Sequence, residues 1–151
     1  MNTQDSCACT QCRALCEFIP GWMMPEEARR AIAEGLAHRL MLCWYTGGGQ
    51  KRIYVLSPAV AGYEGKIGPQ AVMSGKDWKR GTCTFYKNQR CEIHASGFKP
   101  LECRLALSCD VAIGRQADDA HKQEIPRAWD SWRSRRIIKR WLRMVERRKV
   151  A

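Results

Sequence analysis

Cysteine is the residue type whose number and spacing in this sequence could do chemistry. The chain of 151 residues contains nine cysteines. Seven of them form two groups, one near the N-terminus and one late in the chain: Cys9, Cys12 and Cys16, then Cys83, Cys91, Cys103 and Cys109. The first group has the spacing C-x2-C-x3-C, which lets two sulfurs reach one ion around a tight turn and places a third sulfur one helical turn further on. Because thiolates bind metals, we interpret these seven cysteines as candidate metal ligands.

Two other interpretations of the cysteines fit the sequence less well. An odd number does not suit a fully paired disulfide framework, and disulfides are rare in the reducing cytosol. A single buried cysteine usually acts as a small apolar side chain. We expect that role for Cys43, which stands alone between the two groups, and we leave Cys7 out of the ligand set.

The order of the motifs around the cysteines is similar to that of a known family. After the cluster Cys9–Cys16 the chain reads C-T-F-Y from Cys83, C-E-I-H from Cys91 and K-P-L-E-C-R from Lys99, followed by Cys109. The chain from Cys9 to Cys109 thereby resembles the YkgJ-type cysteine-cluster family, a zinc- or iron-chelating domain named for the motif C-x2-C-x2-C-C. The P-G-W and P-E-E segments that follow the first cluster look like one branch of that family.

The resemblance implies a metal but fixes neither its identity nor its number. Leu15 stands where the family's name motif has a cysteine, and Lys99 stands where the family usually has an arginine. A tetrahedral zinc site and an iron–sulfur cubane each use four ligands, so seven cysteines exceed one site and do not complete two. His94, three residues after Cys91, could supply a nitrogen ligand. We expect either an iron–sulfur cluster or zinc, because both accept thiolates.

The first half of the chain contains two elements that could position the first cysteine group. Proline and acidic residues in Met24–Glu27 predict the start of a helix. Apolar residues at steps of four predict that this helix continues to Leu40, and Gly47–Gly49 ends the unit. Ile53–Leu56 predicts a short strand that Pro58 stops.

The second cysteine group lies on a predicted hairpin and a short helix. Thr84–Tyr86 and Glu92–His94 predict a β-hairpin around Lys87–Arg90. Leu101–Leu107 could form one helix of two turns, whereas Ala59–Lys79 and Arg115–Glu124 are expected to be irregular. The sequence therefore predicts an α+β fold, a small metal-stapled domain with a short antiparallel hairpin, an N-terminal helix and a long basic C-terminal helix. We place the cysteine-cluster domain at residues 1–125 and the C-terminal helix, packed on it, at residues 126–151.

The C-terminal segment is strongly basic. Arg127–Lys149 carries ten of the 26 Lys and Arg residues and two acidic residues, a net charge of +8 within a total of +11. A helix that begins at Pro126 would bury one apolar stripe on the domain: Ile138, Trp141, Leu142 and Val145. Trp129 and Trp132 point away from that stripe. Its basic side could be a solvated surface, could attract nucleic acid or an acidic protein, or could lie at a membrane surface.

The sequence narrows the function only in part. We find no Ser-His-Asp set, no HExxH and no flanking carboxylate pair, so whether the chain is an enzyme stays open. The longest apolar run, Leu40–Tyr45, is six residues, and a bilayer span needs about 20. With no secretory signal visible, we expect a cytoplasmic protein.

We therefore expect a metal-binding protein whose metal is mainly structural and whose basic tail binds a partner. An iron–sulfur enzyme or redox protein is one alternative, because related cysteine-cluster domains occur in flagellin lysine methylases. A nucleic-acid-binding adaptor that uses Arg127–Lys149 is the other.

Overall fold

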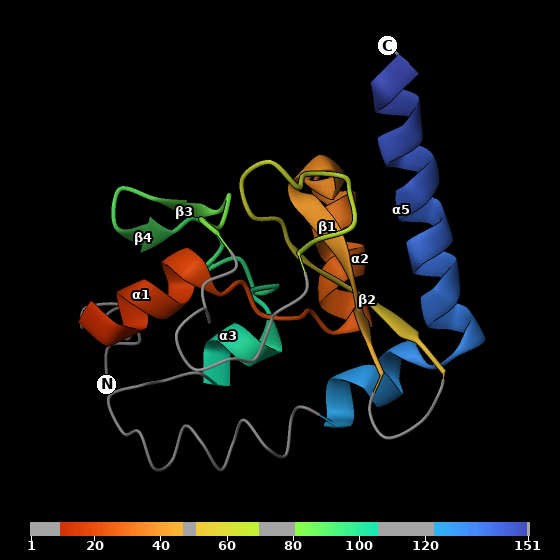
Figure 1. The fold of residues 1–151 in the computed structure, drawn as a ribbon, viewed down its shortest axis with the longest axis horizontal. Helices are drawn as coiled ribbons and strands as arrows, with labels where there is room; N and C mark the ends of the chain where they lie inside the picture. The colour runs from red at the N-terminus through yellow and green to blue at the C-terminus, as the bar shows by residue number, and fades with distance from the viewer. Residues whose placement is uncertain (1–9, 47–50, 70–80, 106–122, 151) are drawn as a thin grey trace.

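The computed structural model of the chain describes residues 10–46, 51–69, 81–105 and 123–150 (Figure 1). The helices are α1 (Thr10–Phe18), α2 (Pro25–Ala33), the 3-10 turn η1 (Ala37–Arg39), α3 (Leu101–Leu105) and α5 (Trp132–Val150). Residues 123–129 are also helical. The strands are β1 (Leu40–Tyr45), β2 (Ile53–Pro58), β3 (Tyr86–Lys87) and β4 (Arg90–Cys91). The fold is α+β, as the sequence predicts.

The strands form two separate antiparallel pairs. In the longer pair, β1 and β2 are in register from Leu40 opposite Pro58 to Tyr45 opposite Ile53. The shorter pair joins β3 to β4 with Tyr86 opposite Cys91. Asn88 and Gln89 link β3 to β4, and both have positive φ (51° and 62°), as in the type I′ turns that favour hairpins.

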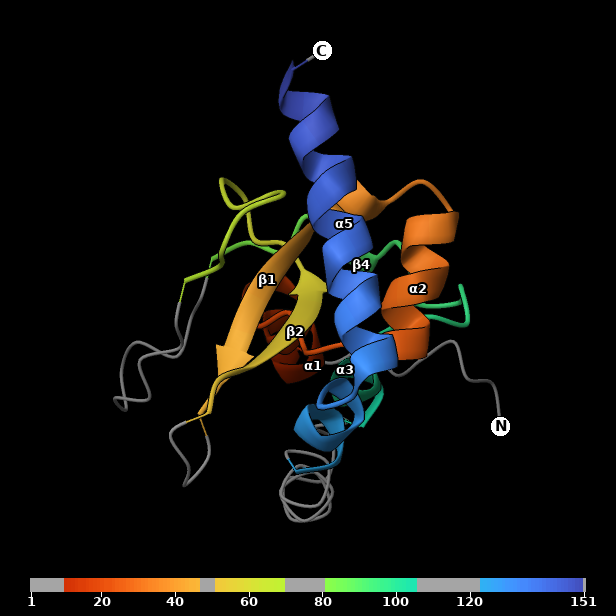
Figure 2. The ribbon, with the colours of Figure 1, turned by 90° about the vertical axis from the view of Figure 1, so that its right-hand side faces the viewer.

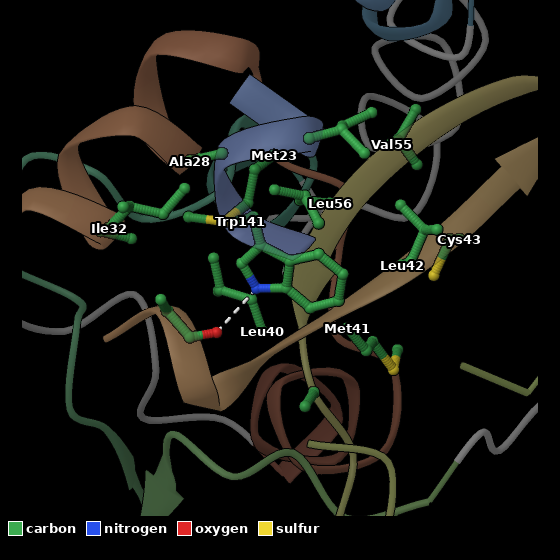
Figure 3. Close-up of a cluster of buried hydrophobic side chains, with 14 of the residues drawn as sticks. Met23, Ala28, Ile32, Leu40, Met41, Leu42, Cys43, Val55, Leu56 and Trp141 are labelled. Atoms are coloured by element: carbon green, nitrogen blue, oxygen red, sulfur yellow. Dashed lines mark hydrogen bonds between the residues drawn. The ribbon is translucent and has the colours of Figure 1, made fainter. Parts of the chain in front are cut away.

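The apolar core lies between the longer strand pair and the helices α2 and α5. In Figure 2, α5 runs across β2 and beside α2, and all three elements contact one another. Trp141 is 1% exposed at the centre of this core, and its Nε1 donates to the carbonyl of Ala37 at 2.7 Å (Figure 3). Trp129 is equally buried and donates to the carbonyl of Met23 at 2.7 Å. The N–H groups of these two indoles thus both have a hydrogen-bond partner, as is common for buried tryptophans.

The prediction that one helix runs from Met24–Glu27 to Leu40 is wrong. Helix α2 ends at Ala33, and Leu40 begins strand β1. Gly35 has φ +80°, the left-handed conformation that ends helices and that other residues adopt only with strain. The apolar run that follows then pairs with β2, so the four-residue spacing of apolar residues spans two elements.

The prediction of one continuous helix from Pro126 is also wrong. The helical segment 123–129 and α5 are separated at Asp130 and Ser131. The Ser131 Oγ accepts the N–H of Ser134 at 3.2 Å, which is an N-cap interaction that starts a new helix. In the apolar stripe, Ile138, Trp141 and Val145 are buried, whereas Leu142 is 38% exposed, contrary to the prediction.

The remaining elements agree with the sequence in kind and differ in their bounds. The hairpin is confirmed, but its strands lie closer together than predicted and its loop has two residues, Asn88 and Gln89. The predicted strand Glu92–His94 is wrong, because these residues form turns after β4 (Arg90–Cys91). The helix from Leu101 is confirmed to Leu105, and residues 106 and 107 lie outside the described part. Strand β2 begins at Ile53 as predicted and includes Pro58.

Candidate metal centre

Four of the seven candidate ligands lie in the part of the chain that the structure describes. Cys16 is in α1, Cys83 lies three residues before β3, Cys91 is the last residue of β4, and Cys103 is in α3. Figure 1 shows α1, the β3–β4 hairpin and α3 gathered on the side of the molecule away from α5. The chain thus brings segments that are far apart in sequence to one end of the fold.

The other three candidate ligands are not tested by the structure. Cys9 and Cys109 lie outside the described residues. Cys12 is in α1, four residues before Cys16, and its side chain lies outside the described part. Residues four apart on a helix share one face, so the backbone of α1 places Cys12 on the same side as Cys16.

Cys83 begins a tight turn whose backbone points at its own sulfur. The backbone N–H groups of Phe85 and Tyr86 donate hydrogen bonds to the Cys83 thiol, and the Tyr86 N–H also bonds the Cys83 carbonyl at 3.1 Å. The Cys83 N–H donates to the carbonyl of Glu17 at 2.7 Å, which fixes this turn beside the end of α1. Donors aimed at sulfur stabilise a thiolate far more than a neutral thiol.

Cys103 receives a similar hydrogen bond from another segment. The N–H of Gly21 donates to the Cys103 Sγ at 3.1 Å. A Cβ at position 21 would lie 2.8 Å from that sulfur, so only glycine lets the backbone approach so closely. The next N–H, of Trp22, donates to the Glu102 carboxylate at 3.0 Å and holds the segment against α3.

The thiols influence one another electrostatically. Burial, with a smaller contribution from the nearby Cys91, raises the pKa of Cys83 to about 11, and the N–H groups of Phe85 and Tyr86 oppose this rise. Burial also raises the pKa of Cys103 well above the ordinary thiol value, and the Gly21 N–H opposes this rise. The charge of Glu102 adds to it, followed by smaller contributions from Cys16 and Cys83. Cys103 is therefore close enough to Cys16 and Cys83 for their charges to affect its pKa, and Cys83 is equally close to Cys91.

These side chains do not form a closed ligand set. Within residues 13–46, 51–69, 81–104 and 123–149, no three His, Cys, Asp or Glu side chains are grouped so that they could hold one ion. The donor set nevertheless fits a thiolate-binding metal. Cys83 is buried, Cys16, Cys91 and Cys103 are half-buried, and backbone N–H groups are directed at the sulfurs of Cys83 and Cys103.

A buried carboxylate joins the helices around Cys103. Glu27 of α2 is 6% exposed, and its Oε2 accepts the N–H groups of Met24 at 2.8 Å and Leu101 at 3.0 Å. Its other oxygen accepts a hydrogen bond from Arg104. Glu27 therefore caps α3 and sets the position of Cys103 relative to α2.

Arg39 holds the hairpin that carries Cys91. Its guanidinium lies 4.1 Å from the centre of the Phe85 ring and donates to the Thr84 carbonyl and to the Glu92 carboxylate. This ion pair lowers the pKa of Glu92. One side chain of η1 thus fixes both the turn after Cys83 and the residue after Cys91.

His94 does not present its Nδ1 as a metal ligand. The Lys99 Nζ lies 2.8 Å from this nitrogen, and Lys99 is 5% exposed. The Lys99 ammonium group therefore contacts the Nδ1 atom of His94, the histidine that the sequence suggested as a nitrogen ligand.

Sequence reasoning missed the residues that support the cysteines. In the sequence, Glu27 is one of the acidic residues at a predicted helix start, Gly21 belongs to the P-G-W segment, and no pattern singles out Arg39. The capping position of Glu27, three residues after Met24, was a usable signal for its role at the start of α2. Its contact with α3, like the contacts of Arg39, joins segments more than 40 residues apart, and local pattern does not reveal such pairs.

No helix in the described part of the chain is both long enough and apolar enough to cross a bilayer. Comparison with family models, curated proteins and solved structures gives no match. The resemblance to the YkgJ-type family therefore rests on the motifs quoted above, and it stays a prediction.

Proposed function

We propose that the chain is a metal-binding protein whose thiolates hold zinc, iron or an iron–sulfur cluster, and that the metal mainly stabilises the fold. Cys16, Cys83, Cys91 and Cys103 are the core of the proposed ligand set, with Cys9, Cys12 and Cys109 as further candidates. The proposal gives the chain no catalytic role.

The observation that carries this proposal is the set of N–H donors aimed at sulfur. Gly21 donates to Cys103, and Phe85 and Tyr86 donate to Cys83. Buried thiols resist ionisation in the metal-free protein, because burial raises the pKa of both cysteines. A bound cation removes that cost, since metal-bound thiols are deprotonated, and the N–H donors then offset part of the negative charge on sulfur.

Elemental analysis of protein purified without oxygen, combined with an absorption spectrum, tests the proposal. Zinc would give a colourless protein with a fixed zinc content per chain. An iron–sulfur cluster would give a broad band at about 400 nm that dithionite bleaches. Protein that contains neither metal after anaerobic purification from metal-replete cells would contradict the proposal.

Two matched variants separate metal ligation from core packing. Cys83 is 6% exposed and Cys43 is 3% exposed, and both belong to the apolar core. Cys83→Ala and Cys43→Ala therefore remove sulfur atoms of similar burial. We expect Cys83→Ala to lose metal and Cys43→Ala to keep it, and equal metal content in the two variants would argue against ligation by Cys83.

The second part of the proposal concerns α5. Its exposed side carries arginine and lysine along its whole length, and the opposite side is buried against α2, η1 and β2. The basic face is therefore available to an anionic partner without disturbing the core. We propose that this helix is the partner-binding part of the protein.

A further inference from the structure

The exposed face of α5 carries one aromatic residue in line with basic residues. Five side chains recur at helical spacing opposite the buried face, and we call them the basic stripe: Trp132, Arg136, Lys139, Arg143 and Arg147. At 1.5 Å per residue the stripe is about 22 Å long. All five residues are exposed.

Trp132 is unusual among the tryptophans of this helical region. It is 58% exposed, whereas Trp129 and Trp141 are each 1% exposed. The guanidinium groups of Arg133 and Arg136 lie 5.5 Å and 5.7 Å from the centre of its ring. An exposed indole flanked by two cations combines a stacking surface with phosphate-binding groups.

The charge of the stripe is not neutralised within the described part of the chain. Near the start of α5, Asp130 forms ion pairs with Arg135 and Lys51. No ion pair in the described part of the chain involves Arg136, Lys139, Arg143 or Arg147. Four uncompensated positive charges on one face complement a polyanion.

We propose that the basic stripe binds single-stranded nucleic acid, with one base stacked on Trp132 and the phosphates along Arg136, Lys139, Arg143 and Arg147. Proteins that bind single strands combine a basic track with aromatic rings on which bases stack. A duplex offers no unstacked base for the Trp132 ring. This inference rests on the partner-binding part of the proposed function and not on the metal.

The packing of α5 argues against a membrane surface as the partner. An interfacial helix buries its apolar face in the lipid headgroup region. The apolar face of α5 is instead buried in the protein, where Ile138, Trp141 and Val145 are 8%, 1% and 6% exposed. Binding to lipid through that face would require unpacking of the core.

The test uses the full chain as purified and a fluorescein-labelled single-stranded RNA of mixed sequence. Fluorescence anisotropy measures binding at several salt concentrations. We expect the affinity for the single strand to fall with rising salt. The affinity for the same RNA as a duplex should be at least tenfold lower. Trp132→Leu should weaken binding about tenfold and leave the salt dependence unchanged, because stacking carries no charge. A triple variant, Arg136→Gln with Arg143→Gln and Arg147→Gln, should reduce the slope of log affinity against log salt by about 2.

A charge-matched control isolates the stripe from net charge. Arg29, Arg52 and Lys66 are exposed and lie outside α5, so replacing all three by Gln removes the same charge elsewhere. This control should change the affinity less than threefold.

Four outcomes would overturn the inference. They are absence of binding, equal binding of duplex, an unchanged affinity in Trp132→Leu, and a control variant as weak as the stripe variant. A fifth outcome, binding of poly-glutamate as tight as that of the RNA at equal charge concentration, would assign the surface to an acidic protein instead. Metal content measured on the same samples keeps the two proposals apart, because loaded protein that binds no RNA overturns only this one.

Discussion

Gly21 is the residue where the candidate metal centre leaves least room. A Cβ there would lie 2.8 Å from the Cys103 Sγ and 2.9 Å from the Glu102 Cβ. We predict that Gly21→Ala lowers the free energy of unfolding by about 1–3 kcal/mol, as overpacking does, because α3 must move. It should also reduce metal content, since the Gly21 N–H can no longer reach the sulfur. Urea denaturation and elemental analysis measure the two effects.

Gly35→Ala provides the control for that prediction. Gly35 has φ +80° with no atom within 4 Å of an added Cβ, so the substitution strains the backbone without a collision. It should lower stability and leave metal content unchanged. If Gly35→Ala loses as much metal as Gly21→Ala, the effect on metal comes from general destabilisation and not from the contact with Cys103.

His38 makes the stability depend on pH. Burial lowers its pKa, the charges of Arg148 and Arg39 lower it further, and a backbone hydrogen bond with Gly35 opposes them. The unfolded chain, with a histidine pKa of about 6.5, therefore binds the proton more readily than the folded one. Stability from this residue is complete above that value and falls as the pH drops below it.

We predict that His38→Gln flattens this part of the pH dependence. Wild-type protein should lose more stability than the variant between pH 7.5 and 5.5, measured as urea midpoints at equal metal loading. Protonation of the cysteines acts on both proteins alike, so the difference between them reports on His38. Parallel curves for the two proteins would show that the histidine does not contribute.

At the scale of elements, the sequence predicts types better than boundaries. The β3–β4 hairpin and α3 are signalled by local patterns of turn and apolar residues. The end of α2 is missed because apolar spacing continues through Gly35 into β1, and the break before α5 is missed because Ser131 acts as a cap. In both places a single residue ends or starts a helix. The periodicity of apolar residues is an average over many positions and does not detect that residue.

The sequence also predicts only some of the residues of the candidate site. The cysteines are visible in the sequence because their type and spacing are unusual. The residues that orient them, Glu27, Arg39 and Gly21, act across large sequence separations. Such contacts depend on how the elements pack, so local patterns in a single sequence do not predict them.

Arg39 is the connection on which the hairpin depends most. We predict that Arg39→Gln lowers the free energy of unfolding by about 1–3 kcal/mol, because the Thr84 carbonyl loses its charged donor and Glu92 keeps only the more distant Lys87, at 3.4 Å. It should also weaken metal retention against a chelator, since Cys83 and Cys91 flank the hairpin.

Arg29→Gln is the matched control for Arg39→Gln. It breaks an ion pair with Glu26 in which both side chains are more than half exposed, and such pairs contribute about 0–1 kcal/mol. Thermal melting and the rate of metal transfer to a chelator compare the two variants. Equal behaviour of both variants would show that Arg39 does not hold the hairpin.

At the scale of the whole molecule, the two ends of the fold differ in the elements that form them. Around Trp141, the helices α2 and α5 and the pair β1–β2 bury a continuous apolar core (Figure 3). At the other end, Cys83, Phe85, Ile93 and Phe98 extend this core, but α1, α3 and the two-residue strands of the hairpin are short, and elements of this size are marginal alone. The proposed metal would stabilise this second end, where structural zinc contributes about 10–16 kcal/mol in small domains.

Removal of the metal should therefore unfold one end before the other. We predict that chelation under reducing conditions speeds hydrogen exchange at the amides of β3, β4 and α3, while those of β1, β2 and α5 stay protected by the apolar core. Hydrogen-exchange mass spectrometry of the loaded and chelated protein measures this directly, and Cys43→Ala serves as the loaded reference because Cys43 lies in β1. Exchange that rises equally in all elements would mean that the core does not fold without the metal. Exchange that rises in none would mean that the cysteines do not stabilise the fold through a metal at all.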